Sequence, residues 1–265
     1  MWWNGKFIWK LLDKDGNVEQ EGEGPNMLHQ LGQQEILKDW LTPFASSLTL
    51  LTNDAISDGA NPSTITAPGN EFDSLVGESG AGLEDGDYVY MVSGESGAEV
   101  TEGFYSVDTA TPASNLIILT ADAGAAATGG VAVYQARRLA LGLDNRSGLS
   151  VTDTAAGVAS YEEDGTGYSR QDLGPRDGTQ WTISFDSDEG AYTAESDAVT
   201  FTATAVTGTD WQANRNVFLA SQLGGLTAPA SDILIASMSL GGAVTIAAGK
   251  SITVQYTAKL TGTNT

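Results

Sequence analysis

The 265-residue chain has no cysteine, a single histidine, and only 12 Lys and Arg residues against 34 Asp and Glu. Without cysteine, neither disulfides nor thiolate metal sites can form. His29 has no second histidine or cysteine to share a metal or catalytic site, which favours a packing or helix-surface role. The net charge of −22 argues against nucleic acid as a partner, because a polyanion is repelled over most of the surface.

Long apolar runs are lacking as well. No stretch approaches the roughly 18 apolar residues needed to cross a bilayer, so no membrane partner is expected. The start, MWWNGKFIWKLLDKDG, has no basic segment followed by an apolar one, which argues against a secretion signal. The lack of cysteine fits a cytoplasmic origin. Proline is scarce at 7 residues whereas glycine reaches 32, a balance typical of turn-rich β proteins.

What is present is a succession of short strand-like segments from Gly165 to Leu260. Each segment is rich in Val, Ile, Thr and aromatics, and each is bounded by Gly, Pro, Asp or Asn. The segments are 167–173, 179–185, 198–206, 216–223, 232–240 and 250–260. In the last one the apolar residues Ile252, Val254, Tyr256, Ala258 and Leu260 alternate with polar ones, as in a half-buried antiparallel strand. The pattern predicts an all-β fold, a jelly-roll-like antiparallel β-sandwich.

The charge is unevenly spread along the chain. Residues 198–265 contain two acids, Asp210 and Asp232, against Arg215, Lys250 and Lys259. The rest of the chain carries all of the acidic excess. We therefore expect the last quarter to supply core and subunit contacts, while the middle faces solvent.

The N-terminal region is predicted to form a hairpin over residues 6–21. Its turn, Lys14-Asp15-Gly16, offers the glycine that such turns need. Asp13, Asp15 and Asn17 also have the first spacings of a calcium loop. Gly24 stands where a bidentate Glu should close that loop, so the plain hairpin is favoured.

The same reservation applies to Asp186, Asp188 and Glu189 before Gly190, and calcium binding by these Asp-rich loops is left open. No cofactor or metal is assigned to the chain.

After Pro25, Asn26 can cap an amphipathic helix running from Met27 to about Thr42. Its apolar stripe is Leu37, Trp40, Leu41 and Phe44.

Aromatic residues gather at the N-terminus. Trp2 and Trp3 lie at an extreme end, where a globular fold rarely buries them. One interpretation is that they fold back on their own sandwich, and the other is an arm that contacts a neighbouring subunit. On the second interpretation, the predicted partner-contact residues are Trp2, Trp3, Phe7 and Trp9.

The middle of the chain carries a self-contained group of five short strands between residues 62 and 137. Segments 47–54 and 139–145, which resemble each other, flank this group. We therefore expect a small β-barrel inserted into the sandwich, with its two ends close together. The predicted divisions are 1–25 for the arm and hairpin, 26–61 for the helix and first sandwich strand, 62–137 for the inserted barrel, and 138–265 for the rest of the sandwich.

The segment 157–167 is predicted to be a long acidic loop. Its carboxylates Glu162, Glu163 and Asp164 are candidates for paired catalytic acids. Neighbouring residues in a flexible loop are not held at a fixed separation, however, so a solvated loop is favoured. No catalytic residue is assigned, and the chain is predicted not to be an enzyme.

Several motifs resemble those of structural proteins of tailed bacteriophages. The "GYxR" strand stands at Gly167–Arg170, the "xVTFxA" strand at Val199–Ala203, and the closing "aGDxIxVxxxxxL" strand at Gly249–Leu260. Upstream, GPNMLHQLGQQEIL resembles the segment that commonly precedes such sandwiches. Residues 62–137 resemble the small barrels that phage proteins carry as insertions, through Gly86–Val89, Gly94 and Gly103–Val107.

This resemblance implies an accessory virion protein on the capsid surface, made in the host cytoplasm. The first hypothesis is a capsid decoration, or cement, protein that binds the major capsid protein as a homo-oligomer; a trimer fits a quasi-threefold site. The alternative is a tail or head-fibre component that binds the host surface through the inserted barrel. A hydrolytic enzyme, the third reading, is the least supported.

Overall fold

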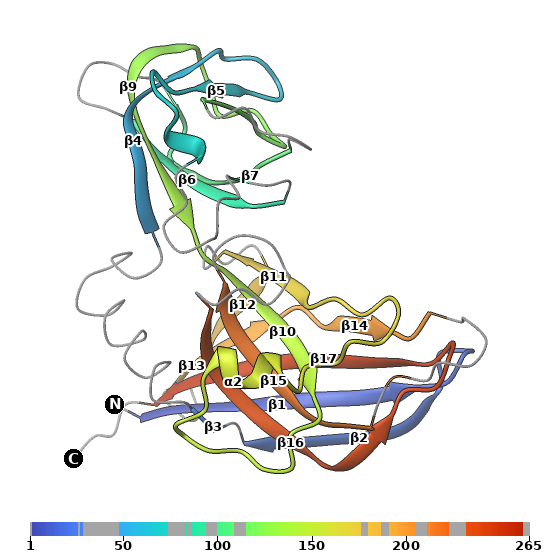
Figure 1. Cartoon of the computed structure of the whole chain (residues 1–265). Coiled ribbons are helices and arrows are strands. Elements are labelled where there is room, and N and C mark those ends of the chain that lie inside the picture. The colour runs from blue at the N-terminus through green and yellow to red at the C-terminus, as the bar shows by residue number, and fades with distance from the viewer. Residues whose placement is uncertain are drawn as a thin grey trace.

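The computed structural model describes residues 2–25, 27–28, 48–73, 83, 86–93, 100–108, 115–175, 180–186, 191–204, 211, 213–222 and 232–261. Within these ranges, the chain is built almost entirely of antiparallel strands in three sheets (Figure 1). The prediction of an all-β fold with a sandwich is confirmed.

The first sheet, which we call the open sheet, has the strand order β12-β13-β17-β1-β2, and β14 also pairs with β17. Its strands are β1 (Trp2–Leu12), β2 (Val18–Pro25), β12 (Trp181–Asp186), β13 (Ala191–Ser196), β14 (Val199–Thr202) and β17 (Ser251–Thr261). β1 pairs with β17 over its full length, from Trp2 opposite Thr261 to Leu12 opposite Ser251. The two ends of the chain therefore form the middle of one sheet.

The second sheet, which we call the enclosed sheet, has the order β11-β10-β15-β16-β3. Its strands are β3 (Met27–Leu28), β10 (Arg138–Asp144), β11 (Gln171–Pro175), β15 (Ala213–Gln222) and β16 (Ile233–Thr245). All seven residues of β10 are buried, as are the last seven of β15, so this part of the sheet is covered on both faces.

The sandwich core lies between these two sheets. The open sheet contributes alternate residues of β17 (Ile252, Val254, Tyr256 and Ala258), as their period of two predicts. The enclosed sheet contributes alternate residues of β10 and β15, such as Leu141 and Leu219. The far face of the enclosed sheet has its own small cluster, in which Phe218, Ala220 and Leu234 pack against Ala155 and Val158 of the short helix α2 (Ala155–Ala159).

The third sheet, which we call the module sheet, has the order β7-β6-β9-β4-β5-β8 and a separate apolar core. Its elements are β4 (Leu48–Ser57), β5 (Thr64–Thr66), the 3-10 helix η1 (Glu71–Asp73), β6 (Tyr88–Val92), β7 (Gly103–Ser106), β8 (Leu116–Ile118) and β9 (Ala127–Ala136). Val107 and Leu119, just beyond β7 and β8, form a bridge, so the sheet curls until its two end strands meet. Figure 1 shows this module at the top, with β9 running down into β10 of the enclosed sheet.

The prediction that the strand at 47–54 opens the sandwich is wrong. β4 pairs with β9 and β5, and with no sandwich strand that the structure describes. Leu48 lies opposite Ala136, so the chain enters and leaves the module at neighbouring positions. The later segment, 139–145, does lie in the sandwich, as β10.

Two further expectations need correction. Met27 and Leu28 form β3 against Ser237 and Ala236, so a helix does not begin at Met27. Residues 29–47, including the remainder of that predicted helix and His29, lie outside the described residues. The strand expected at 167–173 begins only at Gln171, because Tyr168 and Arg170 lie in a loop where their side chains make buried polar contacts.

Candidate functional site: the open sheet and the buried ion pairs

The outer face of the open sheet is polar and carries most of the lysines. Side chains alternate along each strand, so the residues between the core positions point to this face. Hydroxyl pairs cross it, with Thr202 Oγ1 2.9 Å from Ser251 Oγ and Thr200 Oγ1 3.3 Å from Thr253 Oγ1. Four of the six lysines of the chain lie on or beside its strands, namely Lys6, Lys10, Lys250 and Lys259.

Three of these lysines pair with glutamates of the neighbouring strand β2. Lys250 Nζ lies 2.6 Å from Glu19 Oε2, Lys6 Nζ lies 3.0 Å from Glu23 Oε2, and Lys10 Nζ lies 3.7 Å from Glu21 Oε2. All of these side chains keep a third or more of their surface exposed. Exposed pairs add little to stability, so these charges remain available to a partner surface.

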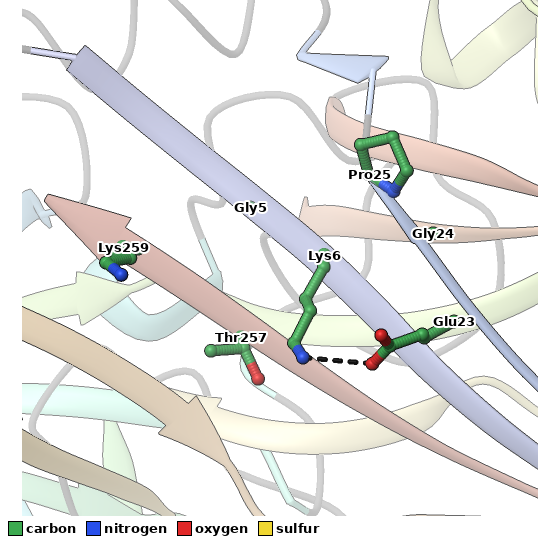
Figure 2. A pocket seen from close by; sticks show the side chains of 7 residues that line it. All are labelled: Gly5, Lys6, Glu23, Gly24, Pro25, Thr257 and Lys259. Atoms are coloured by element: carbon green, nitrogen blue, oxygen red, sulfur yellow. Dashed lines mark hydrogen bonds and ion pairs between the residues drawn. The ribbon is translucent and has the colours of Figure 1, made fainter.

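A shallow depression of about 370 Å³ opens where β2 ends. It is lined by Gly5, Lys6, Glu23, Gly24, Pro25, Thr257 and Lys259 (Figure 2). Figure 2 shows Lys6 reaching across to Glu23, with Thr257 and Lys259 on the adjoining strand β17. Its polar groups are two lysines, one carboxylate and one hydroxyl, a set suited to surface contact.

The two edges of the open sheet differ in character. β2, at one edge, has the sequence VEQEGEGP, with a glutamate at every second position and a proline at its end. Charged residues and proline are the usual protection of an exposed strand edge. β12, at the other edge, has the sequence WTISFD and carries no charge before Asp186. Ile183 and Phe185 of β12 are 66% and 56% exposed.

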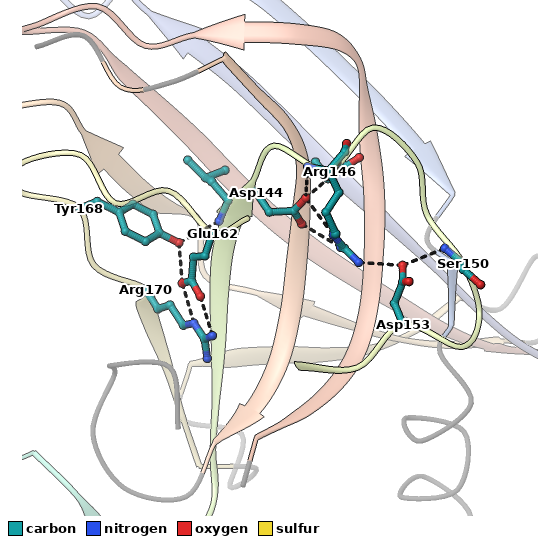
Figure 3. Close-up of polar contacts among 9 residues, drawn as sticks. Asp144, Arg146, Ser150, Asp153, Glu162, Tyr168 and Arg170 are labelled. Atoms are coloured by element: carbon teal, nitrogen blue, oxygen red, sulfur yellow. Dashed lines mark hydrogen bonds and ion pairs between the residues drawn. The ribbon is translucent and has the colours of Figure 1, made fainter. Parts of the chain in front are cut away.

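The buried charges lie beneath the loop that covers the enclosed sheet, and the first group centres on Arg170. Its Nε and Nη2 donate to the two oxygens of Glu162, each at 2.7 Å (Figure 3), and its Nη1 donates to Asp232. Tyr168 donates its hydroxyl to Glu162 at 3.0 Å. The guanidinium also lies 5.1 Å from the ring centre of Phe218. The group joins the covering loop to β16.

The environment of this group shifts three pKa values, and burial raises that of Asp232 above its ordinary value. Burial raises the pKa of Tyr168 well above its ordinary value of 10.0, and the charge of Glu162 adds to the effect. Burial alone would lower the pKa of Arg170, but hydrogen bonds and charge from Glu162 and Asp232 raise it instead. Arg170 therefore stays charged and Tyr168 neutral throughout the physiological pH range, which suits a structural connection.

A second buried group centres on Arg146. Its guanidinium contacts both oxygens of Asp144, at 3.0 and 2.8 Å, and Asp153 at 2.7 Å (Figure 3). Asn216 donates to Asp144 at 2.6 Å from the opposite strand β15. Arg146 and Arg215 line a small depression of about 190 Å³. Asp144 and Asp153 offset the charge of Arg146 in this depression.

A third group joins the module to the sandwich. Arg138, the first residue of β10, donates to Asp87 of the module at 2.7 Å and to Asp172 of the sandwich at 3.4 Å. Tyr88 of the module donates to the same carboxylate of Asp172 at 3.2 Å, and its ring lies 5.3 Å from the Arg138 guanidinium. Arg138 therefore braces the junction between the module and the sandwich.

The structure reassigns the predicted partner-contact residues. Phe7 and Trp9 point into the sandwich core, at 0% and 7% exposure, so the prediction that they contact a partner is wrong for the folded chain. The backbones of Trp2 and Trp3 pair with Thr261 and Leu260 of β17, so this segment is part of its own sheet. The side chains of Trp2 and Trp3 lie outside the described part of the structure.

The interpretation of 157–167 as a solvated loop is wrong for two of its three carboxylates. Glu162 pairs with Arg170, while Glu163 is buried and accepts bonds from the Gly165 amide and Asn214 at 2.8 and 2.9 Å. Only Asp164 of the three is exposed. The sequence contained a signal for the burial of these carboxylates. Arg170 is one of the few bases in the strand-rich region, and a buried arginine needs an acidic partner.

The turn at Asp13 has the geometry of a tight hairpin. Asp13 accepts bonds from the backbone amides of Asp15 and Asn17 and from the Asn17 side chain, at 2.8 to 2.9 Å. These bonds lower the pKa of Asp13, and the bond from the Asn17 side chain has the largest effect. Among the described residues, no three His, Cys, Asp or Glu side chains come together as a metal site would require. Asp188 and Glu189 lie outside the described residues, as does the Asp186 side chain.

No described helix has the length and apolar character to cross a membrane. Comparison of the chain with known protein families, curated proteins and solved structures finds no match.

Proposed function

We propose that this chain is a non-enzymatic structural protein of a tailed-bacteriophage virion, which decorates the head by binding the major capsid protein and stabilises it. The motif resemblance supports the phage context. The observation that carries the structural role is the use of the buried charges: Arg138 and Arg170 each connect segments that are distant in the sequence, and Arg146 holds the 144–153 stretch together. In the described part of the chain, these groups form joints between elements.

The outer face of the open sheet is the surface that we assign to the capsid. It is extended, rich in hydroxyl groups, and holds Lys6, Lys10, Lys250 and Lys259 in a chain of net charge −22. Elsewhere the acidic excess repels other copies and keeps particles apart. A decoration protein stabilises a head by burying area across neighbouring capsid subunits, so that opening the shell must also break these contacts.

The test is to locate the chain on purified particles with an antibody, viewed by negative-stain electron microscopy. Labelling over the whole head is expected. Labelling confined to the tail or to fibres would overturn the proposal and support host binding through the module. If particles whose genome carries the gene show no label at all, both head decoration and host binding through the module are overturned.

A second experiment tests the assigned face. The triple variant Lys6→Glu, Lys10→Glu, Lys259→Glu is expected to reduce cosedimentation with heads that lack the protein by at least about tenfold, because it inverts the cationic surface. The matched control reverses one module charge, at the exposed Asp122, to Lys. Equal binding by both variants would contradict the assignment.

A further inference from the structure

The uncharged edge of the open sheet has the character of an interaction surface. β12 is the last strand on its side, and no described strand pairs with its outer edge. On its inner edge it pairs with β13, with Ile183 opposite Ala194. A strand edge left open presents amide and carbonyl groups that can continue the sheet with another strand.

One face of this edge strand is apolar, and part of it is exposed to solvent. Trp181, Ile183 and Phe185 alternate along β12, so they share a face. Trp181 packs against Tyr256 at the border of the core, with ring centres 6.2 Å apart. Further along β12 the same face leaves the core and faces solvent. Ile183 and Phe185 are more than half exposed there. An exposed apolar strip on an open edge marks an interface.

We propose that β12 pairs with β12 of a second copy of this chain, antiparallel and about a two-fold axis at Ile183. The sequence Trp181-Thr182-Ile183-Ser184-Phe185 alternates apolar and polar residues and has the same alternation in both directions. Antiparallel pairing about Ile183 places Trp181 opposite the partner's Phe185, and Thr182 opposite the partner's Ser184. Apolar residues meet apolar ones on one face, and hydroxyls meet hydroxyls on the other.

Charge favours a second copy at this edge. Two chains of net charge −22 repel each other over most of their surfaces, so self-association needs an uncharged contact. Residues 181–185 supply one, whereas the opposite edge, β2, presents Glu19, Glu21 and Glu23. The contact is isologous: the same five residues serve both subunits. It requires no capsid, so it can be tested apart from the proposed function.

The test is the mass of the purified chain, measured by analytical ultracentrifugation over about 1–100 µM, the range in which small interfaces associate. We expect a monomer–dimer equilibrium. Ile183→Lys places two like charges opposite each other at the axis, and should raise the dimer dissociation constant at least about tenfold. The matched control is Val18→Lys, at an exposed position of β2 on the other edge of the same sheet. It should leave the constant unchanged.

The absence of cysteine allows a direct test of the register. Ile183→Cys lies opposite its own copy in the proposed pair, so mild oxidation should give a disulfide-linked dimer. Val18→Cys should remain monomeric under the same oxidation. The inference would be overturned if the natural chain stayed monomeric throughout the concentration range or formed a trimer. It would also be overturned if the two lysine variants had the same dimer dissociation constant. Equal cross-linking of the two cysteine variants would also overturn it.

Discussion

The two sheets of the sandwich use charge in opposite ways. The enclosed sheet is covered on both faces, and the charged side chains on or beside its far face, such as Arg170 and Asp144, are buried in multiple hydrogen bonds. The open sheet keeps one face in solvent, and its lysines form simple exposed pairs with β2. Buried ion pairs therefore connect parts of the fold, whereas exposed ion pairs leave their charges available to a partner.

The largest expected effect is the loss of a buried guanidinium. Arg170→Met leaves Glu162 and Asp232 buried without their cation, and should lower the free energy of unfolding by about 3–5 kcal/mol. Urea unfolding followed by tryptophan fluorescence measures this loss. All six tryptophans lie outside residues 48–137, so the signal does not report on the module.

The next effect tests the double-sided packing of the enclosed sheet. Gly142 lies opposite Phe218, and a Cβ added at Gly142 would come within 2.2 Å of the Phe218 ring. Gly142→Ala should therefore cost about 1–3 kcal/mol by overpacking, in the same urea experiment. Gly242→Ala, in β16 of the same sheet, meets no atom within 4 Å and serves as the control. If both variants lose equal stability, the far face of β10 is not packed as described.

A smaller effect is expected at the exposed pairs of the open sheet. Lys250→Met removes the partner of Glu19, but both side chains remain about one-third exposed. The loss should stay below about 1 kcal/mol and should shrink as salt is added. A loss as large as that of Arg170→Met would abolish the distinction between the two sheets.

The smallest effect concerns pH at the hairpin turn of the open sheet. Hydrogen bonds from Asn17 lower the pKa of Asp13 below its ordinary value of 3.8. The folded state therefore favours the charged carboxylate, and this contribution is present above pH 3.8 and lost as the pH falls through the lowered pKa.

Asp13→Ala should accordingly have a slightly lower melting temperature than the natural chain at neutral pH, with the difference narrowing in acid. Thermal unfolding between about pH 3 and 7 measures this. Lys14→Ala, in the same turn, is the control for loss of a side chain without loss of the carboxylate. A difference that grows in acid would contradict the assigned direction.

Local patterns predicted much of the fold. The alternation in 252–258 correctly assigns β17 and its buried face, and the Asp-Gly turn correctly gives the β1–β2 hairpin. The same patterns could not decide partners. β4 has the same strand character whether it pairs with the sandwich or with β9, since pairing depends on residues about 80 positions away. Similarly, Phe7 and Trp9 suit either a core or an interface, and only the pairing of β1 with β17 places them inside.

The candidate site shows the same division. Composition indicated the acidic surface and the shortage of cations, but not that four lysines gather along one sheet. The acidic segment at Glu162 has the composition of a solvated loop. It is buried because Arg170, eight residues further along the loop, and Asn214, on strand β15, supply the bonds that offset its desolvation.

The sequence by itself determined an all-β chain with alternating strands, tight turns, a strong negative charge and no thiol chemistry. These properties follow from residue type and local spacing, which act over a few positions. The tertiary structure alone decided which edge of the open sheet is charged and which is uncharged. It also decided which charges are buried. Those depend on long-range strand order, which brings the two chain ends into one sheet and leaves β12 at its border.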